Sequence, residues 1–398
     1  MYPHAFIACL SGLSPNLYAL FRCDRFTHLD RFYVNLFIRA SPNRTRDIWS
    51  ANLVERFTTL TRGPIRCLCV LRNTPGLCKT RLVSAIYRCY HRSHRIFEPP
   101  QKYIQLKTLS NNKMRILLFG PGWIGSKLLT LFHSLNIETR VATSRANHKS
   151  AVTDELNEYR PTHVVSCIGR THGKIDNIEI PTIDYLEYPG KLVDNVTDNL
   201  YAPVLLAHLC SERDIHYTYI GTGCIFEYDE TKNIFTEEDL PNFFGSSYSI
   251  VKGITDQMMS LYNNTLNVRI RMPITAEVND RDFITKIVRY EKICSIPNSM
   301  TVLDELLPIL VDMIQTSRTG TIHLTNPGVI SHEEILEMYR EIVDPQKTWK
   351  TMTYEEQSRL LKSKRSNNKL DTTLLQEWYP HVSDIHTAVR RALERRKG

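Results

Sequence analysis

Hydrophobic and polar positions change their pattern abruptly at residue 114. From there on, short apolar runs alternate with segments in which apolar residues recur at helical spacing. Strands that alternate with helices through short connections indicate a parallel, doubly wound α/β sheet. We predict helices at 123–135 and 331–343, and Ser331 and Glu334 have the spacing of a capping box in the second. The predicted strands are 114–120 (MRILLFG), 137–143 (IETRVAT), 162–169 (THVVSCIG), 215–222 (IHYTYIGT), 267–272 (NVRIRM) and 321–326 (TIHLTN).

Residues 1–113 lack this alternation, and their charge differs from that of the remaining chain. They hold 18 Lys and Arg against 5 Asp and Glu, a net charge of +13, whereas residues 114–398 carry −5. The basic balance of the whole chain therefore does not predict a nucleic-acid-binding surface on its larger part. We expect 1–113 to be a disordered Cys- and Arg-rich extension ahead of a natural start at Met114. A transit segment and a separate folded module remain alternatives.

Cysteine usage and hydropathy indicate the class of protein. Six of the ten cysteines precede residue 114, and they show no repeated C-x-x-C that would favour a zinc site. The other four are scattered, which is typical of reduced thiols in a cytosolic protein. No apolar run approaches the roughly 18 residues of a membrane span. We therefore expect a cytoplasmic protein that binds neither a membrane nor a metal.

A glycine-rich loop joins the first predicted strand to the first predicted helix. Gly120, Gly122 and Gly125 form the pattern G-x-G-x-x-G around Trp123 and Ile124. Glycines at this spacing allow a tight turn and bring backbone N–H groups close to a pyrophosphate at the helix N-terminus. The loop therefore predicts a Rossmann-type dinucleotide site; a structural turn is the alternative.

The end of the second predicted strand distinguishes between nicotinamide cofactors. An NAD site usually places an acid there for the ribose hydroxyls. This strand instead runs into Ser144 and Arg145. A guanidinium suits the additional phosphate of NADP, so we predict NADPH as the cofactor. Gly169, at the end of the third predicted strand, completes the predicted cofactor site.

Two residues typical of carbonyl reduction follow in the segment SSYSIVKG. Tyr248 and Lys252 stand four residues apart, which places both side chains on one face of a helix. An adjacent ammonium favours the phenolate, so we expect Lys252 to lower the pKa of Tyr248. Tyr248 then donates a proton to a carbonyl oxygen, and Lys252 holds the nicotinamide ribose.

Thr222 and Cys224 follow the fourth predicted strand. If the segment is extended, residues two apart face the same way, and both side chains point into the pocket of Tyr248. Thr222 then adds a second hydroxyl donor. A free thiol is a plausible proton-abstracting base once it is activated, although a buried inert cysteine explains Cys224 equally well from the sequence.

From about Met114 to the C-terminus, the chain resembles the bifunctional UDP-4-keto-6-deoxyglucose 3,5-epimerase/4-keto-reductases, which make UDP-rhamnose. These enzymes belong to the extended short-chain dehydrogenases/reductases. Residues 1–113 have no counterpart in this resemblance. It is carried by the segments GWIG, PTHVVSCIGRTHG, TGCIFEYD, PNFFGSSYSIVKG, RIRMPI, FITKIVRYEKICSIPNSMTVLDELLPI, NPGVISHEEILEMYR and RSNNKLDTT.

The resemblance implies a role for each matching position. Cys224 falls on the proposed epimerisation base, and Lys286 in FITKI falls on its proton-donating partner. Arg365 and Asn367 in RSNN fall near the segment that contacts the nucleotide-sugar. The reductase triad falls on Thr222, Tyr248 and Lys252. One departure is the first loop, GPGWIG, which is one residue shorter than the usual G-x-x-G-x-x-G and contains a proline.

The implied enzyme is one NADP-binding domain over 114–398, with its substrate-binding part mainly after about residue 273. It epimerises UDP-4-keto-6-deoxyglucose at carbons 3 and 5 and then reduces the ketone with NADPH. A homodimer is an open expectation. Two alternatives remain: a 4-keto-reductase without epimerase activity, and a catalytically silent NADP-binding subunit.

Overall fold

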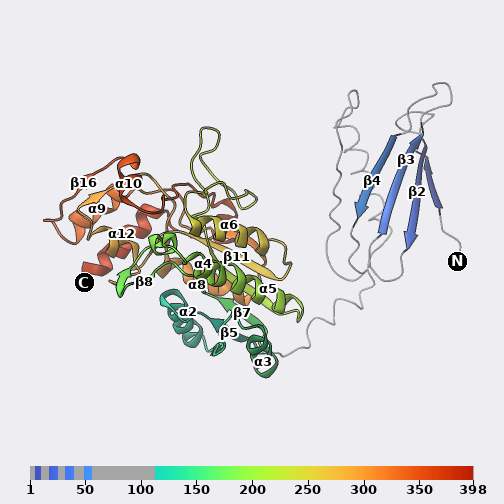
Figure 1. Ribbon diagram of the computed structural model, residues 1–398, viewed down its shortest axis with the longest axis horizontal. Coiled ribbons are helices and arrows are strands. Elements are labelled where there is room, and N and C mark those ends of the chain that lie inside the picture. Colours follow the sequence, from blue (N-terminus) through green and yellow to red (C-terminus); the bar gives the residue numbers. More distant parts are fainter. Residues whose placement is uncertain (1–4, 10–17, 26–31, 40–48, 56–112, 398) are drawn as a thin grey trace. The chain divides into compact units, whose positions relative to one another are not determined.

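The chain divides into two compact units, Met1–Leu109 and Ser110–Gly398 (Figure 1). This computed structural model describes residues 5–9, 18–25, 32–39, 49–55 and 113–397. In the first unit, the described segments form an antiparallel four-stranded sheet in chain order. Apart from these four strands, the expectations that residues 1–113 are disordered, form a transit segment or hold a zinc ion concern residues outside the described ones. The strands are β1 (Ala5–Cys9), β2 (Tyr18–Arg25), β3 (Phe32–Arg39) and β4 (Trp49–Glu55).

The second unit is built around a parallel six-stranded sheet with the order β15-β11-β10-β7-β5-β6. All six strands predicted from the apolar runs are present. The chain passes from β5 to β6 on one side and then returns to β7 on the other side of β5, so the strand order reverses between β5 and β7. Folds of this kind bind their ligands at such a point, outside the carboxyl ends of the strands. The strands are β5 (Arg115–Phe119), β6 (Glu138–Val141), β7 (His163–Ser166), β10 (His216–Thr222), β11 (Thr265–Ile270) and β15 (Gly320–His323).

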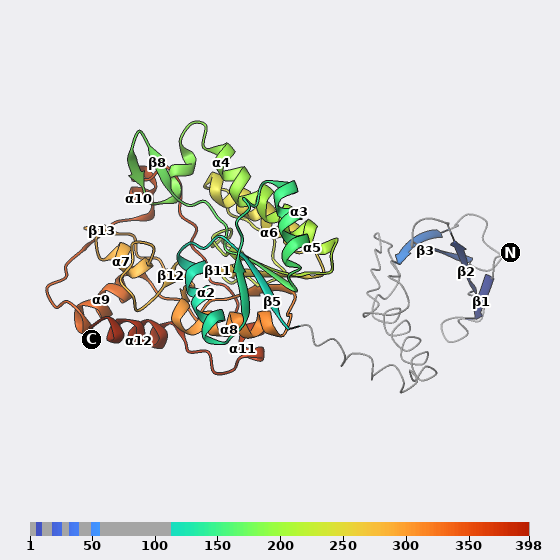
Figure 2. The same ribbon diagram turned by 90° about the horizontal axis from the view of Figure 1, so that it is seen from below.

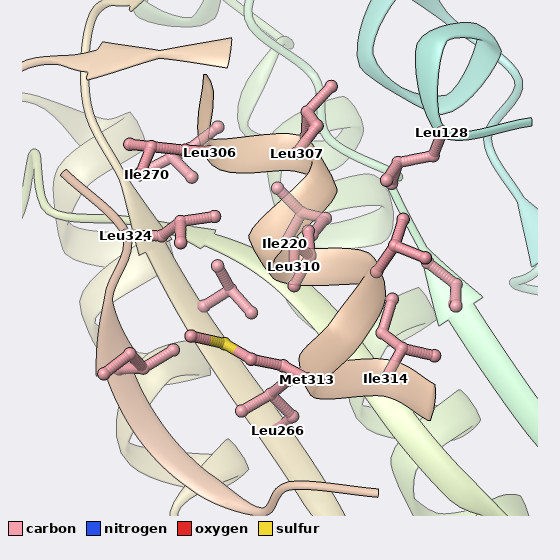
Figure 3. Close-up of a cluster of buried hydrophobic side chains, with 14 of the residues drawn as sticks. Leu128, Ile220, Leu266, Ile270, Leu306, Leu307, Leu310, Met313, Ile314 and Leu324 are labelled. Atoms are coloured by element: carbon pink, nitrogen blue, oxygen red, sulfur yellow. The ribbon is translucent and has the colours of Figure 1, made fainter. Parts of the chain in front are cut away.

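Helices cover both faces of this sheet (Figure 2). On one face, Leu310 and Met313 of α8 pack with Leu266 and Leu324 from the sheet side (Figure 3). A separate buried cluster fills the opposite face. The doubly wound prediction is therefore confirmed. The first layer holds α2 (Trp123–Ser134), α8 (Leu303–Gln315) and α11 (Thr373–Trp378); the second holds α3 (Lys149–Tyr159), α5 (Ala202–Ser211) and α6 (Ser247–Met259).

A smaller region, formed mainly by residues after 273, has its own hydrophobic cluster. The predicted capping box is confirmed at the start of α9, where Ser331 and Glu334 bond to each other's backbone N–H groups. This region contains β12 (Pro273–Ile274), α7 (Phe283–Ile287), β13 (Lys292–Ile293), β14 (Thr301–Val302), α9 (His332–Ile342), β16 (Lys350–Thr351), α10 (Tyr354–Leu360) and α12 (Ile385–Lys397).

The remaining elements lie between β7 and β10. A π-helical turn, η4, interrupts the helical stretch that leads into α5. Of the helices that the structure describes, none is long and apolar enough to cross a membrane. The elements are β8 (Gly173–Ile175), β9 (Ile178–Ile180), η3 (Ile183–Glu187), α4 (Leu192–Val196) and η4 (Thr197–Tyr201).

We propose that 114–398 is the catalytic domain, and a chain that begins at Met114 tests this. β5 begins at Arg115, and Ile116, Leu117 and Leu118 are fully buried within the second unit. The shortened protein is therefore expected to keep the melting transition and the turnover of the full chain, as measured by calorimetry and cofactor oxidation. Insoluble or inactive shortened protein would make residues 1–113 a necessary part of the enzyme.

Candidate active site

The three glycines of the first loop differ in their backbone conformation and in the space around them. Gly120 has a φ of +79°, a conformation that other residues rarely adopt. A Cβ on Gly125 would lie 2.2 Å from the carbonyl oxygen of Gly120, which is impossible without moving the backbone. A Cβ on Gly122 would meet nothing within 4 Å. Trp123 begins α2, whose first turn has neither a side-chain cap nor an acid. The loop thus leaves open space at an uncapped helix N-terminus, which fits a pyrophosphate.

An acidic side chain of α3 fixes the turn after β6 through hydrogen bonds. The strand pattern did not reveal this residue. Glu155 of α3 accepts the backbone N–H groups of Thr143 at 2.8 Å and Ser144 at 2.9 Å. Burial opposes ionisation of Glu155, but the hydrogen bonds it accepts outweigh this and lower its pKa. Both of its oxygens are therefore occupied by backbone donors. Arg145 is exposed and has no ion-pair partner among the described residues.

Asn199 organises the loop that follows β7. Its side-chain oxygen accepts the backbone N–H of Arg170 at 2.8 Å, and its amide nitrogen donates to the carbonyl of Arg170 at 2.9 Å. The ideal Cβ position of Gly169 lies 3.4 Å from the same Asn199 oxygen. Asn199 lies in the π-helical turn η4, a feature that often marks functional sites. No spacing rule links residues 170 and 199, so the role of Asn199 could not be predicted from local sequence patterns.

Cys224 lies in a turn, and the expected extended geometry is wrong. β10 ends at Thr222, and the following residues bend because the Cys224 N–H donates to the Thr222 hydroxyl at 3.1 Å. From the other side, the Ser249 hydroxyl of α6 donates to the Cys224 carbonyl at 2.7 Å. The half-buried Cys224 still packs against the cluster that contains Tyr248. The two residues therefore meet through tertiary packing and not through alternation along a strand.

Buried contacts from distant segments hold this turn. A Cβ on Gly223 would lie 2.6 Å from the side chain of Leu370 and 3.0 Å from the stem of Arg271, so a larger residue there would have to displace buried side chains. Asn368 donates to the carbonyl of Gly223 at 2.9 Å and to that of Phe226 at 2.8 Å. The C-terminal segment thus fixes the backbone on both sides of the cysteine.

Tyr248 and Lys252 lie on one face of α6, as predicted, but their electrostatics differ from the prediction. Both are buried, with 8% and 4% of their surface exposed. Burial raises the pKa of Tyr248, and the Thr222 hydroxyl offsets this rise only in part. Burial also lowers the pKa of Lys252 to about 8. The expectation that Lys252 depresses the pKa of Tyr248 is wrong for this arrangement, because Lys252 donates its hydrogen bond to Tyr219 instead.

Lys286 lies on α7, whose N-terminus is capped by Asp282. Burial lowers the pKa of Lys286, and the charge of Arg281 lowers it further. The pKa of His172 is lowered by burial first, and then by cations that include Arg281 and Lys286. These three side chains are therefore electrostatic neighbours. In the described part of the chain, no hydrogen bond joins Lys286 to Cys224.

The residues of the RSNN segment make internal contacts. Arg365 pairs with Asp184 at 2.5 Å, and Asp184 also accepts the Ser363 N–H at 2.9 Å. Burial opposes ionisation of Asp184, but hydrogen bonds from Thr182 and Arg365 lower its pKa to about 2. This ion pair joins the C-terminal segment to η3, and no local sequence pattern predicts it.

Asn367 is also engaged within the protein. Its side-chain oxygen accepts a hydrogen bond from Asn298 at 2.9 Å, and its backbone carbonyl accepts the N–H of Tyr228 at 2.9 Å. A role for Arg365 and Asn367 in binding the nucleotide-sugar stays a prediction. No group of three or more His, Cys, Asp or Glu side chains gathers into a metal-binding arrangement within the described ranges.

Comparison with known proteins identifies close relatives, although no family model matches the sequence. The chain is 51% identical over 290 residues to a protein of Acanthamoeba polyphaga mimivirus, covering 71% of this chain and 99% of that one. It is 40% identical over 283 residues to the bifunctional dTDP-4-dehydrorhamnose 3,5-epimerase/dTDP-4-dehydrorhamnose reductase of Arabidopsis thaliana, covering 69% and 91%. A trifunctional UDP-glucose 4,6-dehydratase/UDP-4-keto-6-deoxy-D-glucose 3,5-epimerase/UDP-4-keto-L-rhamnose-reductase of the same plant is 39% identical over 279 residues, 68% of this chain and 40% of that one.

Solved structures agree with these sequence relatives. The UDP-rhamnose synthase of Acanthamoeba polyphaga mimivirus superposes with a TM-score of 0.68 at 51% identity, covering 71% of this chain and 99% of that one. A dTDP-4-dehydrorhamnose reductase of Bacillus anthracis, solved with NADP, has a TM-score of 0.59 at 18% identity over 70% and 98% of the two chains, and shows the shared fold. The chain belongs to the family of bifunctional 3,5-epimerase/4-keto-reductases that act in nucleotide-rhamnose synthesis.

Proposed function

We propose that the protein converts UDP-4-keto-6-deoxy-D-glucose to UDP-L-rhamnose by 3,5-epimerisation followed by NADPH-dependent reduction of the 4-keto group. The observation that carries this proposal is the packing of Cys224 against the cluster of Tyr248 at the end of β10. We assign UDP and not dTDP as the nucleotide of the substrate, because the relative that is 51% identical is a UDP-rhamnose synthase. That the enzyme forms a homodimer and acts in the cytoplasm stays a prediction from the sequence.

Epimerisation requires a base, an acid and donors to the ketone oxygen. The ketone at carbon 4 acidifies the protons on carbons 3 and 5, so a thiolate at Cys224 can remove them. The hydroxyls of Thr222 and Tyr248 then stabilise the enolate oxygen, which a buried site does more strongly than water. The ammonium of Lys286 then donates a proton to the opposite face of the sugar carbon, while the proton that was removed stays on the sulfur of Cys224. Its lowered pKa makes Lys286 a better acid than an exposed lysine.

Reduction uses the same hydroxyl donors. NADPH supplies the hydride when it is bound. Tyr248 donates its proton to the oxygen of carbon 4, and its raised pKa keeps it in the phenol form that has this proton. Lys252, with a pKa of about 8, is mostly an ammonium ion at neutral pH and holds the nicotinamide ribose. One polarised carbonyl therefore serves both steps.

The residues that we propose to hold the cofactor fit a dinucleotide phosphate. The open space at Gly122 and the uncapped start of α2 fit the pyrophosphate. Arg145 is exposed and has no ion-pair partner in the described part of the chain, which suits the 2′-phosphate. The Ser144 N–H is already bound by Glu155. Trp123, Ile124 and Gly169 complete the proposed site.

Three variants are expected to differ in their effects on epimerisation and reduction. Tyr248→Phe removes the proton donor, so NADPH oxidation collapses. Cys224→Ala removes the base, so deuterium exchange at carbons 3 and 5 in heavy water falls by about 10²–10⁴-fold. Lys286→Ala retains more exchange and shifts the product toward incompletely epimerised sugars. These effects are measured by absorbance and by NMR of the sugar.

Cys294→Ala is the matched control, because Cys294 is a buried cysteine at the end of β13. It is expected to keep wild-type exchange. Wild-type exchange in Cys224→Ala would exclude Cys224 as the base. Wild-type protein that oxidises NADPH without exchange at carbons 3 and 5 would support the 4-keto-reductase without epimerase activity. Wild-type protein that oxidises no NADPH with the keto-sugar would support the silent subunit.

Arg145→Ala is expected to reduce the preference for NADPH over NADH. A charge-assisted contact contributes roughly 1.5–3 kcal/mol, so kcat/KM with NADPH should fall about tenfold to a hundredfold. The value with NADH serves as the internal control and should not change, because NADH lacks the phosphate. An unaltered preference in the variant would exclude Arg145 from this role.

The glycine loop offers a pair of matched substitutions. Gly125→Ala introduces a contact of 2.2 Å with backbone, so it is expected to lower the melting temperature and abolish cofactor binding. Gly122→Ala meets nothing in the protein, so the melting temperature should stay unchanged while NADPH binding, measured by calorimetry, weakens. Unaltered NADPH affinity in Gly122→Ala would argue against a pyrophosphate at this position.

A further inference from the structure

Lys252 has an unexpected partner on the neighbouring strand. Its Nζ donates a hydrogen bond to the phenol oxygen of Tyr219, a fully buried residue of β10. The nitrogen lies 4.5 Å from the centre of the Tyr219 ring. The two residues are 33 positions apart in the chain, so only the packing of α6 on β10 brings them together. The proposed mechanism assigns no role to Tyr219.

Lys252 has no other hydrogen-bond acceptor in the described part of the chain, and no carboxylate lies within ion-pair distance of it. The carboxylate of Asp256, one turn further along α6, is already bound to other side chains. It pairs with Arg269 at 2.6 Å and accepts a hydrogen bond from Asn267 at 2.7 Å. A buried ammonium without an acceptor is strongly disfavoured. Tyr219 is therefore the group that satisfies the charge of Lys252.

We propose that Tyr219 is a positioning residue for the reduction step, and that its phenol oxygen holds Lys252 in the charged form and in the place from which Lys252 serves Tyr248 and the cofactor ribose. This inference rests on the proposed function for the reaction that it assists. The phenol is a suitable acceptor because burial raises the pKa of Tyr219 and keeps it neutral.

The charge state of Lys252 depends on few other groups. Burial is the main cause of its low pKa, while Asp256 on the same helix and Cys224 from the turn after β10 oppose the effect. The carboxylate of Asp256 is largely neutralised by Arg269. Tyr248 carries no charge near neutral pH, since its pKa is raised. Loss of the acceptor at Tyr219 should therefore lower the pKa of Lys252 further.

Tyr219→Phe tests the inference, and Tyr217→Phe is its matched control. Both tyrosines are fully buried on β10, but the Tyr217 hydroxyl has no hydrogen-bond partner among the described residues. Each variant keeps the ring and loses one oxygen. The readout is the pH dependence of kcat/KM for NADPH oxidation with UDP-4-keto-6-deoxyglucose. Deuterium exchange at carbons 3 and 5 reports on the epimerisation step in the same samples.

In Tyr219→Phe, activity should fall on the basic side at a pH about one to two units lower than in the wild type. A hydrogen bond to a charged group changes a protonation equilibrium by about tenfold to a hundredfold. Exchange should stay within about twofold of the wild type. Tyr217→Phe should leave both measurements unchanged. A Tyr219→Phe profile that coincides with that of Tyr217→Phe would overturn the inference. Wild-type protein without NADPH oxidation would instead overturn the proposed function.

Melting temperatures give a readout that does not need activity. The folded-state pKa of Lys252 lies below its unfolded value, so its buried charge destabilises the fold below that pKa and the penalty lessens as the pH rises. The melting temperature of Tyr219→Phe should therefore lie further below that of the wild type at pH 7 than at pH 10. An equal loss at both values would indicate a merely structural side chain.

If Tyr219→Phe fails to fold, combining it with Lys252→Met decides the matter. Removal of the charge restores folding if Tyr219 serves Lys252. It leaves the protein unfolded if the Tyr219 hydroxyl serves the core alone, and that result would also overturn the inference.

Discussion

The position of Cys224 depends on buried contacts between the turn after β10 and segments that come much later in the chain. Gly223 accommodates the stem of Arg271 and the side chain of Leu370, and Asn368 binds the carbonyl of Gly223. Because these groups are shielded from water, an unsatisfied carbonyl or a displaced stem would be costly. The C-terminal segment therefore sets the geometry of a thiol that precedes it by more than a hundred residues.

Burial also determines which protons the site holds. It raises the pKa of Tyr248 and lowers that of Lys252, so near neutral pH the two groups are a phenol and an ammonium ion. A phenol is the form that can donate a proton to a carbonyl oxygen. The usual argument, in which lysine makes tyrosine more acidic, does not describe this site, because the hydrogen bond of Lys252 goes to Tyr219. Desolvation is the larger effect here.

Some features of the site follow from local rules, and others do not. The spacing of Tyr248 and Lys252 places them on one face of α6 because both belong to one helix. Strand alternation predicted that the chain is extended from Thr222 to Cys224. This prediction is wrong, because a hydrogen bond from the Cys224 N–H to the Thr222 hydroxyl bends the chain. The ion pair of Asp184 with Arg365 joins residues 181 positions apart, so no local pattern could reveal it.

The sequence alone determined the six strands of the parallel sheet and their order along the chain, the helices α2 and α9, the glycine loop and the capping box of α9. These features depend on the periodicity of apolar residues and on backbone constraints that act within a few residues. The resemblance to the epimerase/reductases also came from the sequence, and the comparisons confirm it. Only the tertiary structure decided that Glu155 holds the turn after β6, that Asn199 orders the loop after β7 and that Tyr219 binds Lys252. Each of these contacts joins different elements, and their partners are set by how helices pack on the sheet.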